Sequence, residues 1–123
     1  MRPRVLCIED DRDNMVLVRR ILNAADFELY EATTAKDGIA MAEERQPDVI
    51  LMDINLPEMD GLTATRHVRE NPKIKHIPVV ALTANVMHDV LEKAMTVGCD
   101  GYIAKPIQVD TLPDEIRKYI RKS

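Results

Sequence analysis

Five polar side chains stand at the ends of short, mostly apolar runs of this 123-residue sequence: Glu9, Asp10, Asp53, Thr83 and Lys105. Three carboxylates that meet in one place repel one another unless a cation binds between them. No histidine or cysteine accompanies them, so the ligands would all be oxygen atoms, and Mg²⁺ is favoured over Ca²⁺ because it binds through one or two carboxylates and a phosphate. With a lysine and a hydroxyl nearby, these residue types suit phosphoryl transfer to a carboxylate, which forms an aspartyl phosphate.

The residue types also suggest individual tasks. Asp10 and Asp53 are expected to bind the metal directly, Glu9 through a water molecule, and the backbone carbonyl of Asn55 would complete the protein ligands. Lys105 is expected to contact one phosphoryl oxygen and Thr83 another. No glycine-rich loop follows the first apolar run, and its acidic end would repel a nucleotide, so a nucleotide or flavin phosphate site is disfavoured there.

Each of these residues also has a purely structural interpretation. The acidic run 9–13 suits the first turn of a helix, Asp53 suits a turn or cap, Thr83 suits a helix N-cap, and Lys105 suits a loop. Together these interpretations require four coincidences, whereas a single site requires only that the segments meet.

The elements that would bring them together alternate between two kinds. Short apolar runs predict strands at 4–9, 27–32, 48–53, 77–83 and 100–105. Helical periodicity predicts helices at 12–25, 35–45, 61–71, 85–97 and 109–122. Strict alternation favours a doubly wound α/β fold, (βα)5 and flavodoxin-like, with a five-stranded parallel sheet. An edge position for the second strand is consistent with the order 2-1-3-4-5. The run 27–32 alternates with charged residues, as an edge strand does, and parallel strands end at one rim where ligands bind.

Composition bounds the class of protein. Hydrophobic residues make up 46% and charged residues 31% of the sequence, which predicts one globular domain spanning 1–123. The net charge of −4 argues against direct binding of nucleic acid, and no apolar run is long enough to span a membrane. Without a secretory layout at the start, a cytoplasmic protein is expected. Cys7 and Cys99 are expected to be buried, inert thiols, and the three histidines surface residues.

Four segments together resemble the response-regulator receiver (CheY-like) family: VLCIEDD at 5–11, LMDINLPEMDG at 51–61, PVVALTA at 78–84 and GYIAKP at 101–106. The resemblance covers essentially the whole chain. It implies roles for nine residues: Asp53 as phosphoacceptor, Glu9 and Asp10 as the acidic metal pair, Asn55 as carbonyl ligand, Thr83 as switch hydroxyl, the Ala84 backbone and Lys105 as phosphate contacts, Tyr102 as switch aromatic, and Pro106 after a cis peptide bond. Glu9 departs from the Asp that many members carry.

The resemblance further implies a two-component response regulator rather than an enzyme. Its phosphoryl donor would be a histidine kinase or a histidine phosphotransfer protein, and phosphorylation would reshape the face formed by residues 85–97, 100–105 and 109–122 for an effector protein. The protein would be a monomer or a phosphorylation-dependent dimer. On this face the apolar positions of 85–97 are expected to be mostly core, with one or two methionines exposed: Met87, Val90, Leu91, Ala94 and Met95.

Other interpretations concern either the protein in which the receiver domain occurs or a different class of function. A stand-alone regulator is favoured by the initial Met1, and a receiver excised from a hybrid kinase is the alternative. A phosphatase of the haloacid-dehalogenase type would need a second Asp as general acid where Asn55 stands. A module that binds partners without phosphorylation would not need the complete acceptor set.

Overall fold

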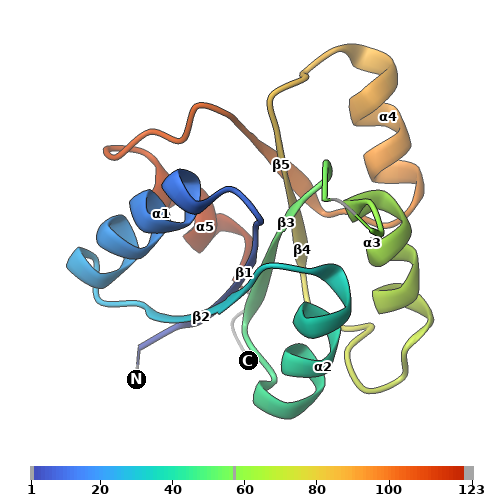
Figure 1. The fold of residues 1–123 in the computed structure, drawn as a ribbon, viewed down its shortest axis with the longest axis horizontal. Helices are drawn as coiled ribbons and strands as arrows, with labels where there is room; N and C mark the ends of the chain where they lie inside the picture. The colour runs from blue at the N-terminus through green and yellow to red at the C-terminus, as the bar shows by residue number, and fades with distance from the viewer. Residues whose placement is uncertain (1, 57, 121–123) are drawn as a thin grey trace.

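The computed structural model describes residues 2–56 and 58–120, in which five parallel strands form one sheet (Figure 1). The strands are β1 (Arg4–Ile8), β2 (Glu28–Ala32), β3 (Val49–Asp53), β4 (Val79–Thr83) and β5 (Gly101–Ala104). The helices are α1 (Arg12–Ala24), α2 (Ala35–Arg45), α3 (Gly61–Glu70), α4 (His88–Thr96) and α5 (Leu112–Tyr119). The order β2-β1-β3-β4-β5 confirms the predicted doubly wound topology.

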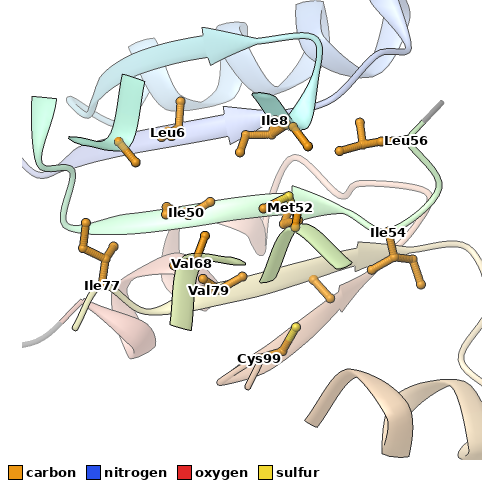
Figure 2. Close-up of a cluster of buried hydrophobic side chains, with 14 of the residues drawn as sticks. Leu6, Ile8, Ile50, Met52, Ile54, Leu56, Val68, Ile77, Val79 and Cys99 are labelled. Carbon is orange, nitrogen blue, oxygen red and sulfur yellow. The ribbon is translucent and has the colours of Figure 1, made fainter. Parts of the chain in front are cut away.

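Helices cover both faces of the sheet because successive strand residues point to opposite sides. In β1, Val5 and Cys7 pack in the cluster that includes α1 and α5, whereas Leu6 and Ile8 pack in the cluster on the α2 and α3 side (Figure 2). The central strands β1, β3 and β4 are almost completely buried, as their apolar runs predict. Strand β2 is a half-exposed edge, and the bidentate contact of Arg19 with Glu31 lies on it.

Side-chain caps fix where three helices begin. Asp11 accepts a hydrogen bond from the Asn14 N–H at the start of α1, Thr34 caps α2, and Asp60 accepts one from the Thr63 N–H at the start of α3. These caps place the loops at the carboxyl ends of β1, β2 and β3.

Helices α4 and α5 begin three residues later than predicted. Before α4, the side chains of Thr83 and Asn85 bond to nearby backbone, which competes with helix formation. Before α5, Val109 is 59% exposed in the loop and not part of the helix, which carries a proline in its first turn. The predicted end of this helix at 122 lies outside the described residues.

The apolar stripe of α4 is less buried than predicted. Only Ala94 is buried, Val90 and Leu91 are half-buried, and Met87 and Met95 are 67% and 51% exposed. The expectation that most of these positions are core is therefore wrong, whereas the expected exposure of one or two methionines is confirmed. The reason is that α4 covers the short edge strand β5, in which Tyr102 and Ala104 are themselves exposed.

The cysteines and the histidines lie in opposite environments. Cys7 and Cys99 are buried free thiols, and His67, His76 and His88 are exposed, as predicted. Among the helices of the described ranges, none is long and apolar enough to cross a membrane.

Candidate functional site

Topology brings the predicted side chains to one rim of the sheet. Glu9 directly follows β1, Asp53 ends β3, Thr83 ends β4 and Lys105 directly follows β5. The parallel register pairs Ile8 with Met52, Asp53 with Leu82, and Thr83 with Ala104, so the four strand ends are level. Residues up to about a hundred positions apart in the sequence therefore meet at the carboxyl edge.

The acidic residues form a compact cluster. Glu9, Asp10 and Asp53 each offer one carboxylate oxygen, and these oxygens lie within 4.8 Å of one another. Glu9 and Asp53 are 1% and 3% exposed, whereas Asp10 is exposed. The backbone of Glu9 is fixed in place because its N–H donates to the Ala32 carbonyl, which extends the hydrogen bonding between β1 and β2 by one residue. The predicted convergence of the three carboxylates is thus present.

Lys105 is the positive charge of the cluster. Its Nζ lies 2.8 Å from Glu9 Oε1 and 3.2 Å from Asp53 Oδ2. The Lys105 N–H donates to the Thr83 carbonyl at 2.8 Å, which continues the β4–β5 ladder and fixes where the side chain starts. The Lys105–Pro106 peptide bond is cis, as the resemblance implied. Sequence reasoning assigned Lys105 to a phosphoryl oxygen and did not foresee its contact with both carboxylates.

The two buried carboxyl groups affect each other's ionisation. Burial raises the pKa of Glu9 to about 7, and the neighbouring Asp53 carboxylate adds to the rise. Burial also works against ionisation of Asp53, but Glu9, the Asn55 N–H and Lys105 together hold the pKa of Asp53 below its usual value. Two carboxylates in little solvent cannot both ionise freely, so Asp53 keeps the negative charge while Glu9 tends to hold a proton.

Local backbone contacts orient Asp53. The Asn55 N–H donates to Asp53 Oδ1 at 2.9 Å, while Oδ2 is the oxygen next to Lys105. Gly61 lies against the end of β3, where an added Cβ would come within 2.6 Å of the Ile54 Cα and would also meet the Asp53 carbonyl. No separate role was predicted for Gly61 within the segment 51–61; a glycine placed this soon after the strand is the sign of a close approach that the sequence offers.

The Thr83 hydroxyl is buried and engaged in a local turn. It donates to the Asn85 carbonyl at 2.9 Å and accepts from the Asn85 N–H at 3.0 Å. Ala84 and Asn85 are exposed at the rim, and Tyr102 is 44% exposed on β5. Thr83 and Ala84 therefore lie at the same rim of the sheet as the acidic cluster, and Tyr102 pairs with Ala81, two positions before Thr83, where its side chain is exposed to solvent.

The donor set fits a hard divalent cation. Glu9 Oε1 is buried and makes no hydrogen bond within the described residues, despite the nearby ammonium group of Lys105. The cluster offers only oxygen ligands, and one of its three carboxylates faces solvent. Such a half-built site suits an ion that retains water and also takes a phosphate oxygen as ligand.

Comparison with known proteins gives consistent matches. The family model described as the response regulator receiver domain matches residues 5–117. The polar-differentiation response regulators DivK of Brucella ovis and Brucella anthropi are each 37% identical to the chain over 120 residues, covering 98% of both partners.

Solved structures agree with this match. Chemotaxis response regulator CheY4 of Vibrio cholerae superposes with a TM-score of 0.91 at 26% identity, covering 97% of this chain and 99% of that one. The receiver domain of sensor histidine kinase PA1611 from Pseudomonas aeruginosa PAO1, crystallised with magnesium in its active-site cleft, has a TM-score of 0.89 at 28% identity and 98% coverage of both chains.

Proposed function

This chain belongs to the response regulator receiver domain family, and we propose that Asp53 is the residue through which it receives a phosphoryl group. Members of this family are signalling switches of two-component systems. The observation that carries the assignment is the position of the Asp53 carboxylate: nearly buried, kept ionised, and next to both a lysine and two further carboxylates.

The acidic cluster is the proposed Mg²⁺ site. Asp10 and Asp53 would hold the ion directly, Glu9 through water, and Asn55 with its backbone carbonyl. A bound Mg²⁺ supplies positive charge that offsets the carboxylates and the phosphoryl oxygens. The magnesium in the cleft of the similar PA1611 receiver supports this choice of ion.

The residues of the chain have distinct tasks in the transfer. A carboxylate oxygen of Asp53 attacks phosphorus, the phosphorus–oxygen bond forms, and the bond to the donor's leaving group breaks. Lys105 is placed to neutralise one phosphoryl oxygen, because its ammonium group is 3.2 Å from Asp53 Oδ2. The Thr83 hydroxyl and the Ala84 N–H would donate to other oxygens, and Thr83 must first give up its bond to the Asn85 carbonyl.

Asp53 is proposed to hold its phosphoryl group as a signal rather than to turn over substrate. A phosphatase that uses an aspartate nucleophile needs a second carboxylic acid to protonate the leaving group. Asn55 stands at that place and has no ionisable side chain. The chain would thus assist only its own phosphorylation and dephosphorylation.

The wider context of the proposal follows the family. The donor would be a histidine kinase or a histidine phosphotransfer protein, and the chain would act as one receiver domain over 1–123. The DivK relatives match over 98% of their length, which favours a single-domain regulator over a module of a hybrid kinase. Tyr102, Met87 and Met95 are exposed, which supports the α4–β5–α5 face as the effector surface.

Intact-mass measurement tests the proposal. With acetyl phosphate and Mg²⁺ the protein should gain the mass of one phosphoryl group, and chelation of Mg²⁺ should prevent the gain. Asp53→Asn should remove the adduct, whereas Asp110→Asn, an exposed aspartate in the β5–α5 loop, should retain it. An adduct that persists in Asp53→Asn, or that forms equally without Mg²⁺, would overturn the assignment.

A further inference from the structure

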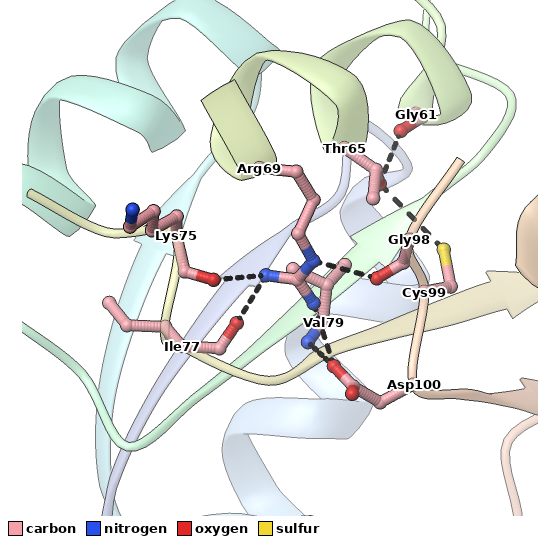
Figure 3. A network of polar contacts seen from close by, with 9 residues as sticks. All are labelled: Gly61, Thr65, Arg69, Lys75, Ile77, Val79, Gly98, Cys99 and Asp100. Atoms are coloured by element: carbon pink, nitrogen blue, oxygen red, sulfur yellow. Dashed lines mark hydrogen bonds and ion pairs between the residues drawn. The ribbon is translucent and has the colours of Figure 1, made fainter. Parts of the chain in front are cut away.

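The sheet edge opposite the acidic cluster carries a polar network centred on Arg69, in the last turn of α3 (Figure 3). Arg69 Nε donates to the Gly98 carbonyl at 2.8 Å, Nη1 donates to the carbonyls of Lys75 and Ile77, and Nη2 pairs with Asp100 Oδ2 at 2.7 Å. One guanidinium group thereby connects the end of α3, the start of β4 and the turn between α4 and β5.

The same network fixes the C-terminal end of α4. Asp100 Oδ2 also accepts from the Val79 N–H at 2.9 Å, and the Asp100 N–H donates to the Val79 carbonyl at 2.8 Å. Gly98 has a φ of +111°, and an added Cβ would lie 2.7 Å from Arg69 Cγ, so the turn fits only without a side chain. The Cys99 N–H donates to the Ala94 carbonyl, which ties the turn to the last turn of α4.

The N-terminal end of α4 is held much less firmly. Its N-cap residue, Met87, provides no side-chain hydrogen bond to the first turn, and residues 84–89 are all exposed. Ala94, close to the other end, is the one fully buried residue among the positions of α4. The contact from this end to the rim is the Thr83–Asn85 turn, which is the turn that a phosphoryl group would open.

From this asymmetry we infer that the Arg69–Asp100 pair is the fixed pivot of α4, so that phosphorylation moves the N-terminal end of α4 and residues 84–87 while residues 97–100 stay in place. The inference rests on the proposed function of Asp53. Its physical basis is that in a hinge motion a rigid element turns about a few residues that stay in place, so an anchored end converts a local change into a defined rotation. The anchor is stiff because the planar guanidinium group holds four acceptors in one fixed fork, whereas a lysine has three donors on a flexible stem.

Amide hydrogen exchange of the full chain, with and without acetyl phosphate and Mg²⁺, tests the pivot. In the wild-type protein, phosphorylation should change exchange of the amides of 86–91 and leave those of Cys99 and Asp100 unchanged. Asp100→Asn removes the charge of the pair, so the Cys99 amide should exchange about tenfold faster, and the response to phosphorylation should spread along the whole of α4.

Two further variants keep the test decisive. Asp114→Asn breaks the exposed Arg117–Asp114 pair of α5 and should alter none of these amides. Arg69→Lys keeps the charge but loses the planar fork, so the Cys99 amide should exchange faster in this variant too. It takes the place of Asp100→Asn in the test if the Asp100→Asn protein does not fold. A phosphorylated wild type whose Cys99 and Asp100 amides respond as strongly as 86–91, or a folded Asp100→Asn with unchanged exchange, would overturn the pivot alone. Absence of any adduct in the wild type would instead overturn the function of Asp53 and the pivot with it.

Discussion

Replacing Lys105 by methionine should destabilise the protein in a way that depends on Mg²⁺. The Glu9 side chain is 0% and that of Lys105 only 16% exposed, and their charged atoms lie 2.8 Å apart. Methionine preserves most of the length and the apolar stem of the side chain but leaves Glu9 and Asp53 without their protein cation.

The expected loss follows from this burial. Removing one partner of a fully buried ion pair costs about 3–5 kcal/mol. Lys105 lies at the rim, and Glu9 already has a raised pKa and can take up a proton instead of remaining charged, so we expect about 1–3 kcal/mol of lost unfolding free energy. For a domain of this size that loss lowers Tm by roughly 4–12 °C.

Urea unfolding with chelator and with saturating Mg²⁺ measures the effect. Since a bound cation offsets the same carboxylates, Mg²⁺ should restore more than half of the loss. Lys118→Met, at an exposed position of α5, is the matched control and should stay within about 0.5 kcal/mol of the wild type. An equal loss with and without Mg²⁺, or no loss beyond that of the control, would refute the electrostatic account.

Three further changes test other parts of the reasoning. Gly61→Ala should cost about 1–3 kcal/mol in urea unfolding and slow adduct formation, because the new Cβ meets β3 backbone. Gly38→Ala, for which the three atoms nearest to the new Cβ all belong to the Ile8 side chain, should leave adduct formation unchanged, and equal rates in both variants would contradict this. Thr83→Ala should still gain the phosphoryl group by intact mass. The change in amide exchange of residues 86–91 on phosphorylation should fall at least to about half, because the Thr83 hydroxyl that closes the turn to Asn85 is gone. An undiminished change would exclude Thr83 as the connection between Asp53 and α4. Cys7 should resist alkylation until the protein is unfolded, since it is fully buried and burial raises the pKa of its thiol; rapid labelling of the native protein would show that β1 opens.

The late start of α4 and the exposure of its methionines show where pattern reasoning fails. The periodicity of 85–97 is real, but Thr83 and Asn85 bond to the backbone that the first helical turn would need. Helical spacing also gives the apolar face without saying how much sheet lies beneath it. Strand β5 has only four residues, so it offers little surface against which the apolar side chains of α4 can be buried.

The Arg69 network shows a second kind of limit. Arg69 and Asp100 are 31 residues apart and look like ordinary surface charges in the sequence. The glycine that admits the guanidinium group, Gly98, predicts the end of a helix but not the partner that fills the space beside it. Such contacts depend on the packing of α3 against the α4–β5 turn, which no local pattern encodes.

The alternation of apolar runs with helical segments was enough to predict a parallel sheet whose strand ends carry Asp10, Asp53, Thr83 and Lys105, and the charged run 27–32 was consistent with the order that the structure shows. How these side chains engage one another depends on tertiary packing, which the sequence pattern does not give. Burial raises the pKa of Glu9, while Asp53 keeps a lowered pKa, and Lys105 lies within ion-pair distance of both carboxyl groups. These effects require the folded protein because the strength of a charge interaction depends on how much water surrounds it.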